Sequence, residues 1–211
     1  KMELAVTNNS VTVLSGLGNG SFSSSVNYAA GLGPSAIISS DFNNDGKLDL
    51  ATTNSNSNNV SILIGYGNGT FSTAINYSTG NYPSSITAND FSNDGIVDIA
   101  VGNRNSNSIS VFIGSGTGIL ASQVNYAVGS NPQAIVSGKF NGDNNFDIVV
   151  VNYASYDVMT IIGSGNGAFN SPVLFGNDLA SYDVITSDFN SDGYQDLASV
   201  NYFPGSISIF L

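Results

Sequence analysis

The nine residues Asp41-Phe42-Asn43-Asn44-Asp45-Gly46-Lys47-Leu48-Asp49 decide the architecture of this chain. Positions 1, 3, 5 and 9 of the stretch carry side-chain oxygens, and position 7 can add its main-chain carbonyl. Such a set suits Ca²⁺, a hard cation that takes several oxygen ligands in a flexible shell. Glycine at position 6 permits the positive φ of a sharp turn. The stretch therefore predicts a cation-binding loop.

The same spacing returns three times, at intervals of 49 residues. The later loops begin at Asp90, Lys139 and Asp188, and the Lys139 copy is altered. A segment of the form Gly-x-Gly-x-Gly, such as Gly65 to Gly69, keeps the same interval, and its four copies lead into predicted strands. A dinucleotide-binding segment would instead precede a helix, so we interpret these copies as hairpin turns. A fixed period of this length indicates a repeat architecture.

Each repeat is predicted to contain four short strands, which in one unit cover residues 35–40, 48–53, 60–64 and 73–78. In the second strand we expect Leu48, Leu50 and Thr52 to alternate with Asp49 and Ala51, as in a strand with one buried face. Four antiparallel strands per repeat are typical of a β-propeller blade. A right-handed β-solenoid is the alternative, but its coils are usually shorter and its strands parallel.

The sequence thus predicts an all-β propeller of four-stranded antiparallel blades, with incomplete first and last blades. It forms a single domain over residues 1–211: a partial blade at 1–31, blades at 32–80, 81–129 and 130–178, and a partial blade at 179–211. Both end blades leave strand edges open to pairing. We expect the chain to be an arc of a longer repeat protein, because it opens inside a repeat. Completion of one copy by another is the alternative.

Composition excludes several classes of protein. Charged residues make up only 9% of the chain, and the formal charge is −11. Eleven of the fourteen aspartates lie in the four loops, so the acidity indicates cation sites. Four Lys and Arg in total argue against nucleic-acid binding by phosphate neutralisation. The absence of Cys and His removes disulfides, thiolate nucleophiles and His-dependent triads, and no apolar run reaches the ~20 residues of a membrane span.

The acidic loop, the following Val60-Ser-Ile-Leu63 strand and the glycine turn ending in Phe71 together resemble the FG-GAP/VCBS repeat family. This unit builds the propellers of integrin α-subunits and of certain fungal lectins, and the resemblance covers essentially the whole chain. It implies a propeller, commonly of seven blades, with Ca²⁺ loops between the first and second strands of a blade. It also implies an extracellular setting and a role in adhesion or recognition.

Three loops match the family pattern fully, so about three Ca²⁺ ions are expected as cofactors. The candidate ligands are Asp41, Asn43, Asp45, the Lys47 carbonyl and Asp49; Asp90, Ser92, Asp94, the Ile96 carbonyl and Asp98; and Asp188, Asn190, Asp192, the Tyr194 carbonyl and Asp196. The altered loop offers a poorer set: Asn141, Asp143, Asn145 and Asp147. There Lys139 replaces the first carboxylate, and its ammonium is expected to neutralise Asp143 and Asp147 in place of a metal.

Three further features are candidates for other roles. Tyr28, Tyr77 and Tyr126 recur at the same interval, with Phe175 in the fourth place, and are expected to pack in the core or at blade edges rather than to stack on a ligand. Tyr182 and Asp183, with Asp178 upstream, form an irregular segment that is a candidate ligand site. Sequons for glycosylation begin at Asn8, Asn19, Asn59, Asn68 and Asn76.

We therefore expect a non-catalytic, extracellular calcium-binding module that recognises a protein or glycan ligand. One alternative is a lectin that binds sugars between blades, with Tyr66 or Tyr153 as an aromatic platform. Another is a structural subunit that assembles through its incomplete end blades. Catalysis is disfavoured because nearly all carboxylates belong to the loops, and Glu3, Asp157, Asp178 and Asp183 form no convergent set.

Overall fold

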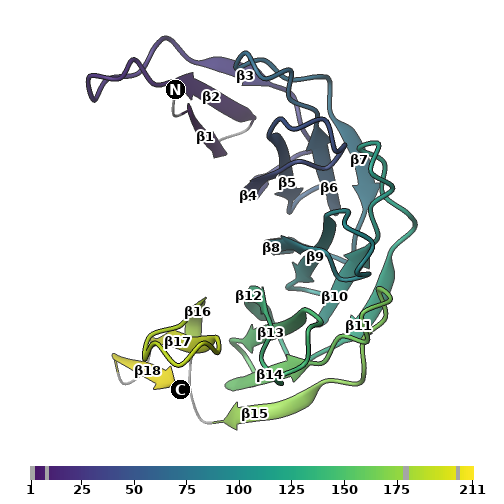
Figure 1. The fold of residues 1–211 in the computed structure, drawn as a ribbon, viewed down its shortest axis with the longest axis vertical. Helices are drawn as coiled ribbons and strands as arrows, with labels where there is room; N and C mark the ends of the chain where they lie inside the picture. Colours follow the sequence, from purple (N-terminus) through teal and green to yellow (C-terminus); the bar gives the residue numbers. More distant parts are fainter. Residues whose placement is uncertain (1–2, 8–9, 178–180, 203–204) are drawn as a thin grey trace.

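The computed structural model describes residues 3–7, 10–177, 181–202 and 205–211. Within these ranges every helix or strand assigned is a β-strand, and the strands form five antiparallel sheets. The sheets follow one another along a curved arc that is open on one side (Figure 1). This confirms the predicted all-β fold of repeating blades.

Each sheet corresponds to one blade, and the bounds of its strands repeat with the sequence period. The first blade contains β1 (Glu3–Thr7), β2 (Val11–Ser15) and β3 (Val26–Tyr28); the second β4 (Pro34–Ser40), β5 (Asp49–Asn54), β6 (Asn59–Leu63) and β7 (Ile75–Ser78); the third β8 (Pro83–Asn89), β9 (Asp98–Asn103), β10 (Ser108–Phe112) and β11 (Val124–Ala127); the fourth β12 (Pro132–Gly138), β13 (Asp147–Asn152), β14 (Asp157–Ile161) and β15 (Val173–Asn177); and the last β16 (Ser181–Ser187), β17 (Asp196–Asn201) and β18 (Ser206–Phe210). Among the described residues, the first and last blades therefore have three strands each.

The second strand of each interior blade is buried on both faces. All six residues of β5 are buried, whereas Leu48 lies outside the strand and is 64% exposed. Leu50 packs with Val11 and Val13 of the preceding blade, and Ala51 belongs to a cluster that contains Ile86 of the following one. The predicted alternation of buried and exposed residues was therefore wrong, because neighbouring blades cover both sides of the sheet.

The first strands of successive blades lie next to one another along the inner side of the arc, where β4, β8 and β12 appear in Figure 1. Polar side chains connect them. Ser35 Oγ donates to the Pro83 carbonyl at 3.0 Å, and the hydroxyl groups of Thr87 and Ser137 lie 2.7 Å apart. These bonds satisfy polar groups at blade junctions, where a missing partner costs more than the bond itself contributes.

The recurring tyrosines lie at blade edges, as predicted, and join consecutive blades. Each is in the last strand of a blade, and its hydroxyl accepts a hydrogen bond from a main-chain amide that follows the glycine turn of the next blade. The bonds run from Phe71 N to Tyr28 Oη (3.3 Å), from Leu120 N to Tyr77 Oη (3.2 Å) and from Phe169 N to Tyr126 Oη (3.1 Å). Phe175, which lacks a hydroxyl, instead packs edge-on against Phe210.

Removal of one such hydroxyl should weaken one junction. In Tyr77→Phe the Leu120 amide loses its acceptor while the aromatic ring stays, so we expect the free energy of unfolding to fall by about 1 kcal/mol. Urea denaturation measures this loss. Tyr66→Phe is the matched control, because the Tyr66 side chain is 55% exposed. Equal effects of the two substitutions would contradict a role of the Tyr77 hydroxyl in the junction.

Candidate metal loops

The acidic loops connect the first and second strands of a blade, and local sequence determines their backbone. In the first loop Asn44 and Gly46 have φ of 56° and 79°. The same two positions are left-handed in the loops that begin at Asp90 and Asp188. The positive φ expected at the glycine of the loop is thus confirmed. Asparagine tolerates this conformation better than most residues, and glycine adopts it freely.

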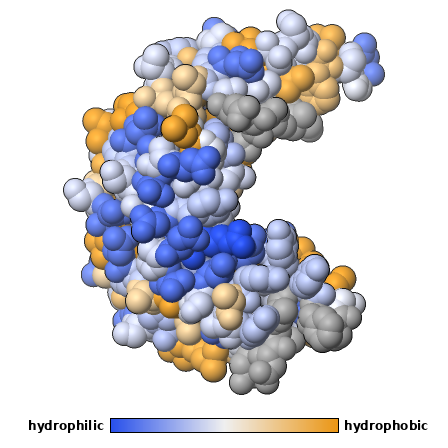
Figure 2. Space-filling model, turned by 180° about the vertical axis from the view of Figure 1, so that it is seen from behind, coloured by the Kyte–Doolittle hydropathy of each residue, from blue (hydrophilic) through white to orange (hydrophobic). Residues whose placement is uncertain are grey.

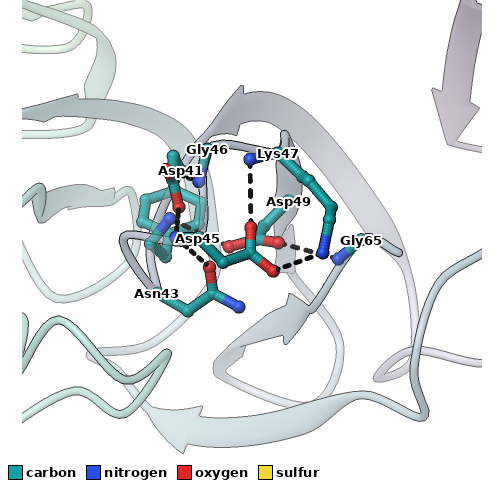
Figure 3. A network of polar contacts seen from close by, with 8 residues as sticks. Asp41, Asn43, Asp45, Gly46, Lys47, Asp49 and Gly65 are labelled. Atoms are coloured by element: carbon teal, nitrogen blue, oxygen red, sulfur yellow. Dashed lines mark hydrogen bonds and ion pairs between the residues drawn. The ribbon is translucent and has the colours of Figure 1, made fainter. Parts of the chain in front are cut away.

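The first aspartate closes each intact loop. Asp41 accepts hydrogen bonds from the main-chain amides of Asp45 (3.1 Å) and Gly46 (2.7 Å), as Figure 3 shows. Asn43 Oδ1 also accepts from the Asp45 amide, at 3.1 Å. The loops at Asp90 and Asp188 repeat both bonds of the first aspartate. These bonds hold the oxygen-bearing side chains on the inside of one tight turn.

Asp45 has a partner that its counterparts lack. Its Oδ1 accepts from the Lys47 amide, and its Oδ2 lies 3.0 Å from Lys47 Nζ (Figure 3). The hydrogen bond from the Lys47 side chain is the main reason why the pKa of the Asp45 carboxyl is lowered. In the other two intact loops the same position is Ile96 or Tyr194. A cation in the first loop would therefore compete with an ammonium group, and a cation in the others would not.

The ninth aspartate is buried and has a structural role. Asp49 is fully buried; its Oδ2 accepts from the Phe42 amide at 2.9 Å, and its Oδ1 accepts from the Gly65 amide at 2.7 Å. Asp98 and Asp147 bond the equivalent amides of their own blades. Burial raises the pKa of the carboxyl groups of Asp49, Asp98 and Asp147, against the effect of these hydrogen bonds.

Sequence reasoning missed this role, although one signal was available. The ninth aspartate is retained in the Lys139 loop, where the first carboxylate of a cation site is lost. A residue kept for metal alone would have no reason to remain there. Its hydrogen bonds to two main-chain amides supply that reason.

The altered loop differs from its prediction. Lys139 Nζ lies over the ring of Phe146, 5.0 Å from its centre, and Lys47–Asp45 is the one ion pair formed among the described residues. The expected pairing of Lys139 with Asp143 and Asp147 was therefore wrong. Asp143 instead accepts hydrogen bonds from the Asn145 amide and the Asn141 side chain, which lower its carboxyl pKa more than the charge of Lys139 does.

The loops at Asp41 and Asp90 also contact the glycine turn of the next blade. The Phe42 carbonyl accepts from the Gly118 amide at 3.1 Å, and the Phe91 carbonyl accepts from the Gly167 amide at 2.9 Å. Gly118 has a φ of 77°, a left-handed conformation that favours glycine, and a Cβ atom there would also displace the end of the Ile64 side chain. The glycine segments form hairpin turns, as predicted, since isolated bridges such as Gly65–Phe71 close them.

The donor set of the intact loops fits a hard cation by its chemistry. It consists of carboxylate, amide, hydroxyl and main-chain carbonyl oxygens, without nitrogen or sulfur. Across the described residues, acidic side chains do not gather in groups of three or more that could hold a metal by themselves. A Ca²⁺ ion would thus depend on the Asn and Ser side chains and the seventh carbonyl as well as on the aspartates.

The remaining candidate ligand residues are dispersed. Tyr182 packs edge-on against Tyr153 of the preceding blade, with ring centres 6.1 Å apart. Asp183 instead lines a small apolar cavity of about 160 Å³ beside Ile185 and Val200 of its own blade. Tyr66 lies in a glycine turn, at the opposite end of a blade from Tyr153. Asp178 lies outside the described residues.

The sequons differ in accessibility. Asn19, Asn68 and Asn76 are exposed, and the first two lie in glycine turns. Asn59 is partly buried at the start of β6, and its Oδ1 accepts from Asn54 Nδ2 at 2.7 Å. Asn8 lies outside the described residues. Glycosylation therefore suits the two turn positions and Asn76 better than Asn59.

The sequence matches the FG-GAP-like repeat over four overlapping stretches, residues 1–52, 41–101, 90–150 and 139–199. The chain belongs to the FG-GAP-like repeat family. These stretches start or end at the acidic loops and include the altered loop at Lys139. No curated protein matches the sequence.

Solved structures with low sequence identity share the fold of this FG-GAP-like chain. A functionally unknown protein from Desulfotomaculum acetoxidans has 16% identity and a TM-score of 0.63, over 95% of this chain and 68% of that one. BBS1N, solved in complex with ARL6DN, has 12% identity and a TM-score of 0.57, over 85% and 58%. The Vibrio cholerae biofilm matrix protein Bap1 has 13% identity and a TM-score of 0.51, over 93% and 34%. The chain therefore spans less than two thirds of BBS1N.

The buried aspartate can be tested without metal, in the altered loop. Asp147→Asn replaces one acceptor oxygen by an NH₂ group that faces a main-chain amide, so we expect a loss of about 1–3 kcal/mol in the free energy of unfolding in chelator. The control is Asp143→Asn, at an exposed position, with an expected change below about 0.5 kcal/mol. Similar urea midpoints for the two variants would show that Asp147 does not hold the loop.

Proposed function

We propose that this chain is a calcium-stabilised, non-catalytic recognition module that works outside the cell and binds a protein or glycan ligand. The observation that carries the proposal is the position of the acidic loops. Each intact loop gathers hard oxygen donors, and those at Asp41 and Asp90 are also hydrogen-bonded to the glycine turn of the next blade. A cation that orders such a loop would stabilise the junction between two blades.

Three loops would hold Ca²⁺ through the side chains at positions 1, 3, 5 and 9 and the carbonyl at position 7. When bound, the ion neutralises the crowded carboxylates of its loop. The chain itself closes each intact loop: the first aspartate accepts from two main-chain amides, and the ninth accepts from the amide of loop position 2. In the loops at Asp41 and Asp90 the ninth aspartate also accepts from the glycine turn of its blade. The loop that begins at Lys139 lacks the two bonds of the first aspartate, so it is expected to remain free of metal.

Weak affinity is expected, which favours an extracellular site. EF-hand loops of high affinity use a bidentate glutamate at position 12, whereas extracellular calcium modules bind at about 10⁻⁴–10⁻³ M. Position 12 of the first loop is Thr52, which is buried and donates to the Ala36 carbonyl at 2.9 Å. Extracellular calcium is high enough to fill such sites, and the exposed sequons would suit the same compartment.

A recognition role agrees with the family and with the surface. FG-GAP-like repeat propellers are generally non-enzymatic, and the BBS1N propeller was solved with a protein partner. Hydrophilic side chains gather over the middle of one face of the arc and reach its concave side (Figure 2). Within the described ranges, no helix has the length and hydropathy needed to cross a membrane.

Removal of calcium should lower the melting temperature. A ligand at a hundred times its Kd contributes about 2.7 kcal/mol to stability, and 1 kcal/mol shifts the melting temperature of a chain of this size by roughly 2–4 °C. For a Kd near 10⁻⁴ M a hundredfold excess is about 10 mM calcium, and from that concentration we expect EDTA to lower the midpoint by roughly 5–10 °C for each filled loop. Differential scanning calorimetry in calcium and in EDTA measures the shift, and an unchanged midpoint would contradict calcium binding.

Single substitutions test which loops bind. Asp192→Ala should remove one site and reduce the calcium-dependent shift by about a third, because three loops are expected to contribute. Asp143→Ala, in the altered loop, should leave the calcium-dependent shift unchanged. Equal reductions in the two variants would show that the shift does not come from the intact loops.

A second candidate function is assembly through the end blades. On the last blade Ile207, Ile209 and Leu211 are 69%, 60% and 77% exposed. Val60 and Ile109 are the counterparts of Ile207 in interior blades, and both are fully buried because the neighbouring blade covers them. Sedimentation in calcium distinguishes the two functions: a monomer of 21.7 kDa at all concentrations supports recognition, whereas larger species support assembly.

A further inference from the structure

The ends of each blade differ in charge. Acidic loops and glycine turns lie at one end, whereas the turn between the second and third strands lies at the other. The chain has a single arginine, Arg104, which follows β9 and therefore lies six residues from Asp98. Six strand residues span about 20 Å, which is more than twice the screening length of about 8 Å at physiological salt. The loops therefore do not neutralise Arg104.

Arg104 is oriented but not paired. Its Nε donates to Asn131 Oδ1 at 2.7 Å, and its main-chain amide donates to the Tyr82 carbonyl at 2.9 Å. The terminal guanidinium nitrogens make no hydrogen bond or ion pair with any residue that the structure describes. The equivalent residues in other blades are Ser55, Tyr153 and Tyr202, so the fold does not require arginine there.

Tyr82 is also in a position where the fold favours a smaller residue. Its φ is 56°, and the same position has Gly33 in the preceding blade and Asn131 in the following one, with φ of 67° and 63°. A bulky side chain is disfavoured in the left-handed region. The Tyr82 side chain is 37% exposed. Strain of this kind, beside an unpaired charge, is typical of functional surfaces.

Asn131 connects this pair to two more aromatic residues. Besides accepting from Arg104, it accepts at its carbonyl a hydrogen bond from the Tyr153 amide at 2.9 Å. Tyr153 in turn packs edge-on against Tyr182, which is 53% exposed. We call Tyr82, Arg104, Asn131, Tyr153 and Tyr182 the Arg104 row. It extends over three consecutive blades at the end away from the acidic loops.

Described carboxylates near this end are engaged elsewhere. Asp157 is buried and accepts from Asn152 Nδ2 at 2.7 Å, whereas Asp183 lines the cavity of the last blade and accepts from the Val184 amide. The Arg104 row thus offers a planar pair of donors without a described partner, and three tyrosines belong to the same row.

We propose that the Arg104 row binds a glycan that ends in a sugar with a carboxylate, such as a uronic or sialic acid. Guanidinium groups form two parallel hydrogen bonds with a carboxylate, and aromatic rings contact the apolar face of a sugar. One carboxylate suits the row better than a polyanion does, because the formal charge of −11 repels polyanions. The proposal rests on the recognition role and does not depend on calcium.

The test compares glycans that end in glucuronic acid with the same glycans after reduction of the carboxyl group to a hydroxymethyl group. The two sets differ only in the carboxylate, so the folded wild-type chain in calcium can be assayed against both on one array. We expect binding to the acidic set to be at least about tenfold tighter, as for a charge-assisted bidentate pair. Equal binding to both sets, or binding to neither, would overturn the proposal.

Two variants locate the carboxylate. Arg104→Gln should abolish the preference for the acidic set while its melting temperature stays close to that of the wild type. Lys139→Gln, which removes a cation at the other end of the blades, should retain the preference. A preference that survives in Arg104→Gln would place the carboxylate on the loop cations and contradict the Arg104 row. Binding to acidic peptides but not to these glycans would overturn the glycan assignment while leaving the recognition role and the calcium-dependent melting intact.

Discussion

The arc depends on hydrogen bonds from main-chain amides that join acidic loops to glycine turns, and the loops at Asp41 and Asp90 are each joined to two turns. Asp49 accepts from the Gly65 amide within its own blade, and the Phe42 carbonyl, one residue into the same loop, accepts from Gly118 of the next blade. One nine-residue loop therefore fixes both the hairpin of its blade and the approach of its neighbour. Gly118 has a φ of 77°, which favours glycine, so the turn that contacts the loop depends on this residue.

The two ends of a blade therefore have different roles. At the loop end, buried aspartates satisfy amides within a blade and tyrosine hydroxyls satisfy amides at successive junctions. A cation would add its stability there. At the other end, turns differ from one blade to the next without disturbing these bonds. Arg104 and Tyr82 are examples, since other repeats have Ser or Tyr in place of Arg104 and Gly or Asn in place of Tyr82. Residues at this end can therefore differ between repeats while the hydrogen bonds at the loop end remain the same.

Much of this could be predicted from sequence, because it recurs. The 49-residue period, the antiparallel blades and the positive φ of Gly46 all follow from local patterns that each repeat shows again. What could not be predicted depends on contacts made only in the folded chain. Burial of both faces of β5 arises from the neighbouring blades. The bonds of Asp147 and the position of Lys139 over Phe146 are contacts within one repeat, and they depend on how its loop folds against the strand and the glycine turn. The Arg104 row was missed because its residues are irregular rather than periodic.

Anomalous diffraction from crystals grown in calcium tests most directly whether the acidic loops are cation sites. Three peaks are expected, one within each of the loops at residues 41–49, 90–98 and 188–196, and no peak is expected in the loop at 139–147. Absence of peaks from the three intact loops in well-ordered density would contradict calcium-stabilised junctions. A fourth peak of equal height beside Lys139 would contradict the role assigned to the first aspartate.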